Sequence, residues 1–279
     1  MLEYDTDYNY ELILKQEREN VATHYGSVSQ AKWELAGGLT DNIESLLEIF
    51  ARTSGTQLAI IPKLAIHGID AVDLTGVFSD RANHVWDFLL HRSGIFAYDS
   101  TLQMFTFAEI DRIRTLEKTK RLYYVAGKMF RWFIFHHQII PYPVEFDPSI
   151  PSFGICGYVP QSVVDIINPA VARVASMVES WNPYSEDSES EIITDDITTW
   201  LDQINMSEGE FLRNLHSGHD GPIRLAFKIS TSAIVGLRAN QFQWFHEGFN
   251  DGFEVESVHQ FTTLKLTIAS SICIFRYYA

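Results

Sequence analysis

The residue in this 279-residue chain best suited to covalent chemistry is Cys273, in the stretch SSICIF. A cysteine acts as a nucleophile when a histidine, a cationic side chain or a helix N-terminus lowers its pKa. The basic residue close to it in the sequence is Arg276, and the segment around both is apolar. This setting favours a buried, unreactive thiol. Cys273 is therefore kept as the single candidate for a catalytic residue, and no other is predicted.

Two pairs of residues have types that bind metals or transfer protons, but their spacing favours structural roles. Asp70 and Asp73 lie in the stretch GIDAVDLTG, where the aspartates and Gly76 fit a strand-to-helix turn with helix capping. His136 and His137 are adjacent, so on a helix their side chains point about 100° apart and do not easily share one metal. Phosphate-binding loops and nucleophile elbows have no match in the sequence. We therefore predict neither a metal site nor a cofactor.

The charge and the cysteine content limit the partners and the compartment. The chain has 36 acidic and 21 basic residues, a formal net charge of −15, which repels phosphate backbones and anionic lipids. Nucleic acid and membrane are therefore not expected as partners. The chain has 2 cysteines, an acidic N-terminus where a signal peptide would be basic, and no apolar run of about 18 residues. These features predict a cytoplasmic or nuclear location.

Hydrophobic periodicity predicts a mainly helical protein with a few strands. Apolar residues recur at helical spacing in 41–52, 80–92, 120–137, 169–181 and 223–249. Asn168 and Pro169 form an N-cap and a first-turn proline for one of these helices. The 120–137 helix is apolar on nearly every side, which indicates a central position, and Gly127 would let a neighbouring backbone approach closely. The stretch 94–109 predicts a β-hairpin.

One domain is expected, flanked by two other segments. The predicted boundaries are a polar N-terminal extension at 1–38, the domain itself at 39–260 and an apolar C-terminal tail at 261–279. Within the domain, 55–66 is expected to be extended, and 141–160 is expected to be irregular because it is rich in proline and glycine. The acidic, serine-rich stretch that begins at 182 predicts a solvated loop.

Four stretches resemble, in the correct order, the N-terminal lobe of a HECT-type ubiquitin ligase. They are NIESLLEIFARTSGTQLAIIPKLAIHGIDAVDLTG, YYVAGKMFRWFIFHHQIIPYPVEF, DIINPAVARVASMVES and RANQFQWFHEGF. In that family an aspartate- and glycine-rich turn opens a long helix, a Gly-Lys step lies in a central helix, and a Gln-x-x-x-Phe-x-x-Gly-Phe helix follows. The residues that carry these motifs here are Asp70, Asp73, Gly76, Gly127 and Gly248. Thr75 replaces the first glycine of the pair that follows the two aspartates in the family's turn.

The resemblance implies an α+β, mainly helical fold like the HECT N-lobe with a small inserted subdomain, and it implies a HECT-family ubiquitin-protein transferase. HECT ligases carry ubiquitin as a thioester on a cysteine in a separate C-terminal lobe, within a Thr-Cys-Phe type motif. The chain continues for about 30 residues past the last matching helix, too few for another domain, and its SICIF stretch has no such threonine. Three interpretations stay open: a ligase whose C-lobe is supplied elsewhere, a non-catalytic binding module, and a compact ligase that uses Cys273.

The partners that the resemblance implies are a ubiquitin-conjugating enzyme and ubiquitin. In the family, the small subdomain of the N-lobe recruits the conjugating enzyme through an apolar groove, and by position this role falls on 185–222. The candidates for an exposed patch on its helices are Trp200, Leu201, Ile204, Phe211 and Leu215. The alternative is that these side chains pack onto the core of the lobe itself.

Overall fold

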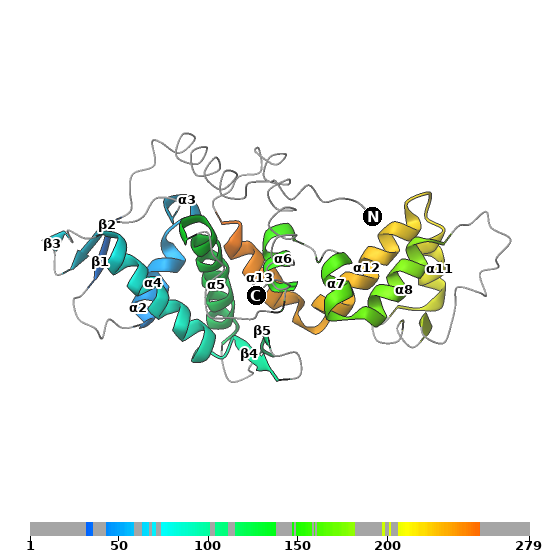
Figure 1. The fold of residues 1–279 in the computed structure, drawn as a ribbon, viewed down its shortest axis with the longest axis horizontal. Helices are drawn as coiled ribbons and strands as arrows, with labels where there is room; N and C mark the ends of the chain where they lie inside the picture. Colours follow the sequence, from blue (N-terminus) through cyan, green and yellow to red (C-terminus); the bar gives the residue numbers. More distant parts are fainter. Residues whose placement is uncertain are drawn as a thin grey trace.

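The computed structural model describes residues between 32 and 251, with gaps. The described ranges are 32–35, 43–58, 63–66, 69–70, 74–100, 104–110, 115–137, 147, 149–157, 159, 161–181, 197–198, 201 and 206–251. Within them the protein is mainly helical with two small sheets, which confirms the expected α+β, mainly helical class. Figure 1 shows two groups of helices side by side along the long axis of the molecule.

The larger group of helices, called the large unit below, is arranged around α5 (Leu116–His137). The other helices of the large unit are α2 (Ile43–Arg52), α3 (Gly55–Leu58), α4 (Leu74–His91), α6 (Ser149–Cys156) and α13 (Ala239–Phe249). Helix α5 contacts α2, α4 and, most extensively, α13. The central position that its apolar sequence predicts is therefore confirmed.

Two short helices lie where the sequence predicts extended or irregular chain, and side-chain caps explain both corrections. At the start of α3, Ser54 and Gln57 form a capping box: Gln57 N donates to Ser54 Oγ (3.2 Å) and Ser54 N donates to Gln57 Oε1 (3.3 Å). At the start of α6, Asp147 Oδ1 accepts from the backbone N and the hydroxyl of Ser149, at 2.9 and 2.6 Å. These caps stabilise helices that composition alone does not favour.

Two small sheets flank the helices of the large unit. One sheet has the order β1–β2–β3, with β1 (Lys32–Leu35) parallel to β2 (Lys63–Ile66), and with β2 antiparallel to β3 (Ile69–Asp70). The other is a hairpin of β4 (Phe96–Asp99) and β5 (Met104–Phe107). The hairpin confirms the prediction for 94–109.

Aromatic side chains hold the hairpin, α5 and α13 together. Phe107 of β5 lies edge-on to Tyr123 of α5 and to Phe242 of α13, with ring centroids 5.1 and 4.9 Å apart. The Tyr123 hydroxyl donates to the carbonyls of Ile95 (2.9 Å) and Ala108 (3.2 Å), so this buried phenol has its hydrogen bonds. The core of the large unit is thus built from rings that the linear sequence keeps far apart.

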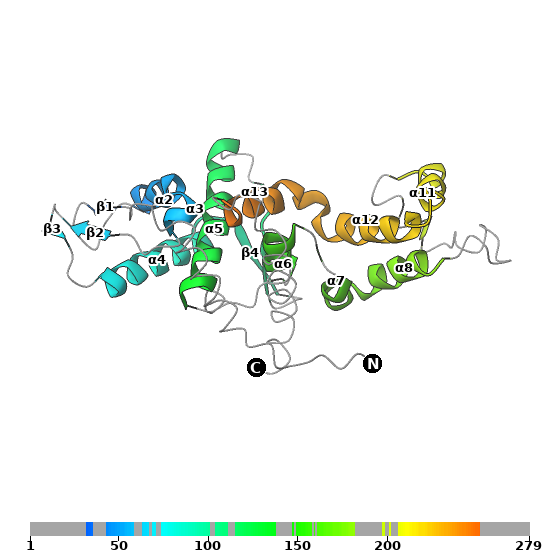
Figure 2. The same cartoon turned by 90° about the horizontal axis from the view of Figure 1, so that it is seen from above.

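The smaller group of helices, called the distal unit below, extends to the other side of α13 in both views (Figures 1 and 2). Its helices are α7 (Gln161–Ile167), α8 (Pro169–Glu179), α11 (Glu208–Leu215) and α12 (Gly221–Val235). Helix α8 begins as predicted, since the Asn168 side chain accepts from Val171 N (3.3 Å) and Pro169 is the first helical residue. A short 3₁₀ turn, η1 (Gly236–Arg238), joins α12 to α13.

Candidate functional site

The predicted docking side chains do not form an exposed patch. Leu201, Phe211 and Leu215 are buried, with exposures of 3%, 0% and 1%, whereas Trp200 and Ile204 lie outside the described residues. Phe211 and Leu215 are four residues apart on α11, so they share the helix face that packs against α12. For the three described residues the expectation of exposure is wrong, and they pack into the protein's own core instead.

Other apolar side chains of the distal unit are exposed. Ile223 and Phe227 lie one turn apart on α12 and are 52% and 47% exposed, and Met177 on α8, the helix packed against α12, is 44% exposed. Large apolar side chains gathered on one helix face are typical of protein-binding surfaces. We call Ile223 and Phe227 the α12 pair.

The sequence contains a signal for the α12 pair that helical periodicity alone does not reveal. In GPIRLAFKIS the buried face of α12 is supplied by Leu225 and Ile229, and the α12 pair lies on a different face of the same helix. A helix that packs on one side needs only one apolar stripe. The second stripe therefore points to an additional use.

The charged residues of α12 itself are both basic, although the chain as a whole is acidic. Arg224 and Lys228 are exposed neighbours of the pair, and α12 itself has no acidic residue. Lys228 Nζ lies 3.1 Å from Glu210 Oε1 of α11, and the Arg224 guanidinium donates to the Ser217 carbonyl at 2.6 Å. These contacts tie the two cationic side chains to α11 and to the residues that follow it.

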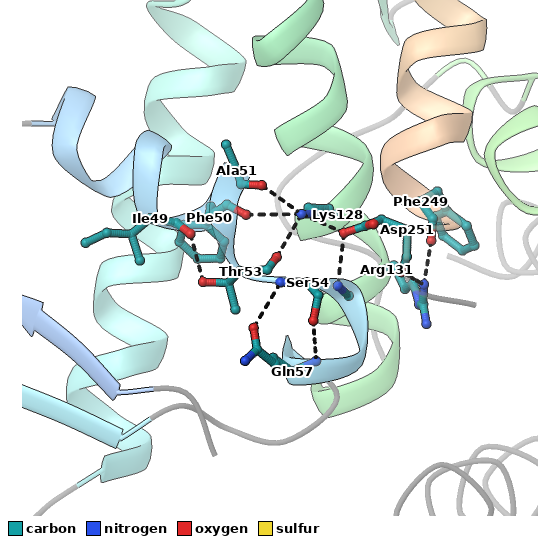
Figure 3. Close-up of polar contacts among 11 residues, drawn as sticks. Ile49, Phe50, Ala51, Thr53, Ser54, Gln57, Lys128, Arg131, Phe249 and Asp251 are labelled. Carbon is teal, nitrogen blue, oxygen red and sulfur yellow. Dashed lines mark hydrogen bonds and ion pairs between the residues drawn. The ribbon is translucent and has the colours of Figure 1, made fainter. Parts of the chain in front are cut away.

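A buried polar cluster in the large unit surrounds Lys128, the lysine of the Gly-Lys step (Figure 3). Its side chain is 2% exposed, and its Nζ lies 2.7 Å from Asp251 Oδ2. The same ammonium donates to the carbonyls of Ala51 (3.0 Å) and Thr53 (2.8 Å), which belong to the end of α2 and the residues after it. A cation at a helix C-terminus satisfies carbonyls that have no partner within the helix.

Asp251 connects three parts of the large unit at the end of α13. Besides Lys128, its carboxylate accepts a hydrogen bond from Gly55 N at 3.0 Å, at the start of α3. Arg131 Nη1, one turn along α5, donates to the carbonyls of Asp251 (3.0 Å) and Phe249 (2.9 Å). The cluster therefore fixes the ends of α2 and α13 on the central helix.

The electrostatics of this cluster are those of a closed structural site. Burial lowers the pKa of Lys128, and the nearby Asp251 carboxylate opposes that shift. Burial, reinforced by Asp251, raises the pKa of Tyr124, whose ring lies 4.7 Å from the Lys128 ammonium. An ammonium that is nearly inaccessible and already bound to a carboxylate and to backbone carbonyls is not positioned to act on a substrate.

The glycines of the resembling motifs mark the closest approach between α5 and α13. A Cβ on Gly127 would overlap the Phe245 carbonyl oxygen and lie 2.8 Å from Phe249 N, and a Cβ on Gly248 would overlap the Tyr124 carbonyl. The prediction that Gly127 allows a neighbouring backbone close is confirmed.

The structure describes some of the remaining predicted residues and not others. Asp70 ends β3 and Gly76 lies in the first turn of α4, whereas Asp73 and the catalytic candidate Cys273 fall outside the described residues. His137 is the last residue of α5. Within the described part of the chain, no group of three or more His, Cys, Asp or Glu side chains is arranged to hold a metal ion.

The comparisons with known proteins add no family assignment. No family model matches the chain, and no curated protein sequence matches it either. Of the helices that the structure describes, none combines the length and the apolar character needed to cross a bilayer.

Proposed function

We propose that this protein is a HECT-related component of ubiquitin transfer, and that its distal unit docks a ubiquitin-conjugating enzyme. The order of the motifs that resemble the HECT N-lobe supports the family. The location of the distal unit, between the Gly-Lys helix and the Gln-x-x-x-Phe-x-x-Gly-Phe helix, supports the docking role, because the family's small subdomain occupies that place in the sequence. Thioester transfer is assigned to no described residue.

The observation that carries the docking proposal is the α12 pair beside its basic neighbours. A few side chains that enter well-packed pockets on a partner commonly supply much of the binding energy, and Ile223 and Phe227 are the exposed candidates here. Arg224 adds a positive charge beside this surface, whereas Lys228 is paired with Glu210, so an acidic group at the rim of a partner surface could pair with Arg224. In this proposal the α12 pair is the docking surface, instead of the buried Leu201, Phe211 and Leu215 that the sequence suggested.

The test is binding to a panel of ubiquitin-conjugating enzymes, measured by calorimetry and by co-elution. The variant Ile223→Ser with Phe227→Ser should fold as the wild type does, because both side chains are about half exposed, and it should bind at least tenfold more weakly. Leu116→Ser is the matched control, because Leu116 is 59% exposed but lies on α5 of the large unit. Equal binding by the double variant and the wild type would refute docking on this face.

A second experiment separates the two versions of the function. A conjugating enzyme loaded with labelled ubiquitin is mixed with the chain, and non-reducing and reducing gels are compared. A reducible adduct that Cys273→Ala abolishes would establish Cys273 as an acceptor and the chain as a compact ligase. Retention of the loaded enzyme without an adduct would support the alternative function, a non-catalytic binding module derived from a HECT domain.

A further inference from the structure

Helices α12 and α13 form an almost continuous helical run that is broken at one place. The sequence predicts a single helix over 223–249, but the structure has α12 end at Val235 and α13 begin at Ala239, with η1 between them. Figure 1 shows the two helices meeting at an angle at this junction. The break decides how the distal unit is oriented on the large unit.

Gly236 is the residue that makes the break. Its φ and ψ of 21° and −113° lie outside the helical region, with a positive φ that L side chains rarely adopt. A Cβ at this position would have no atom within 4 Å, in contrast to Gly127 and Gly248. Close packing therefore does not explain this glycine, and the backbone conformation does.

The last turn of α12 before the break is only partly covered by the rest of the protein. Thr231, Ser232, Ala233 and Ile234, the turn of α12 that leads to it, are all only half-buried. The distal unit is held together internally, with α12 against α7, α8 and α11, and by hydrogen bonds such as that from Ser230 Oγ to Gln161 Oε1 (3.1 Å).

The other point at which the chain passes between the units also follows a glycine. Gly157 has a φ of 76° and ends α6, with its N–H donating to the Phe153 carbonyl at 2.7 Å. Where two groups of helices are connected through such glycines, a few residues can absorb a change in their relative direction, which is the usual condition for a hinge.

We propose that Gly236 is the pivot of a hinge about which the distal unit turns as a rigid body relative to the large unit. Rotation about Gly236 changes the direction in which the α12 pair faces without disturbing the packing within either unit. The inference does not depend on a ubiquitin-conjugating enzyme as the partner, because it concerns the free chain.

Distances between nitroxide spin labels test the hinge in the full chain. The background is a variant with Cys156→Ser and Cys273→Ser. Labels at Glu117→Cys and Arg213→Cys report across the units, and labels at Arg173→Cys and Arg213→Cys report within the distal unit; all three positions are exposed. The distance distribution across the units should be clearly broader than the one within the distal unit. Equal widths would overturn the proposal.

The substitution Gly236→Ala then tests the pivot itself. It disfavours the positive φ and should draw α12 and α13 toward one continuous helix, which shifts and narrows the distribution across the units and leaves the one within the distal unit unchanged. Gly218→Ala is the matched control, because Gly218 also has a positive φ (93°) and open space around it but lies within the distal unit. It should change neither the centre nor the width of the distribution across the units.

The other possible results of the spin-label experiment also test the hinge at Gly236. A broad distribution that Gly236→Ala leaves unchanged would place the hinge elsewhere, and a narrow one that merely shifts would make Gly236 a fixed bend. If Gly236→Ala does not fold, one extra glycine inserted after Gly236 replaces it. The insertion should broaden the distribution across the units, and an unchanged width would overturn the proposal.

Discussion

The substitution Lys128→Met gives the sharpest test of how the large unit is held together. Methionine keeps much of the length and apolar volume of the lysine stem but removes the ammonium. That ammonium lies 2.7 Å from Asp251 Oδ2 and 3.0 and 2.8 Å from the carbonyls of Ala51 and Thr53. The variant therefore leaves a carboxylate and two backbone acceptors without their cation.

The structure sets the size of the expected effect. Removing one partner of a buried ion pair costs about 3–5 kcal/mol, because the other charge stays buried and uncompensated. The Asp251 side chain is 24% exposed, so water can reach it in part, and the cost should fall near about 3 kcal/mol. Replacing Asp251 with asparagine in the same chain removes the uncompensated charge and should restore part of the loss.

Urea unfolding followed by tryptophan fluorescence measures these changes. Lys118→Met is the matched control, because Lys118 also forms a close ion pair, 2.8 Å from Glu44, but both side chains are more than 40% exposed. Its loss should stay within about 1 kcal/mol. A loss for Lys128→Met no larger than that of Lys118→Met would refute the view that the buried ammonium fixes α2 and α13 on α5.

Three further predictions test the packing, the electrostatics and the correction to the docking surface. Gly127→Ala should destabilise the fold by about 1–3 kcal/mol, because its Cβ would lie 2.8 Å from Phe249 N, whereas Gly209→Ala in α11, with its nearest atom 3.8 Å away, should stabilise it by about 0.5–1 kcal/mol. Changes of opposite sign in the free energy of unfolding, measured in urea, would confirm both expectations, and equal changes would contradict them. Burial and the Asp251 carboxylate raise the pKa of Tyr124. Above pH about 10 the unfolded chain therefore loses the phenol proton of Tyr124, whereas the folded chain keeps it. The free energy of unfolding consequently falls as the pH rises. Tyr124→Phe should reduce that fall in unfolding curves from pH about 9 to about 11, and an unchanged slope would count against the assignment. Phe211→Ala should cost about 3–5 kcal/mol in thermal or urea unfolding, since Phe211 is fully buried; a change below about 1 kcal/mol would indicate that it acts as a surface residue.

Local sequence was sufficient where one segment carries its own signal. The Asn168-Pro169 start of α8 and the β4–β5 hairpin follow from caps and alternation, and they appear where expected. The capping box of α3 and the Asp147 side-chain cap of α6 were equally local but were obscured by neighbouring prolines, glycines and β-branched residues.

The sequence by itself determined the helical class of the protein, the central position of α5 and the close approach at Gly127, because each depends on the residues of one segment and their period. Only the tertiary structure shows that Phe211 is buried while Ile223 is exposed, because an apolar stripe in the sequence does not reveal which neighbouring element, if any, packs against that stripe. Only the tertiary structure pairs Lys128 with Asp251, which lies 123 positions further along the chain. Only the tertiary structure shows that the expected single helix is two helices, separated at Gly236. These features depend on which segments meet in space, and that choice is made by the packing of the whole chain.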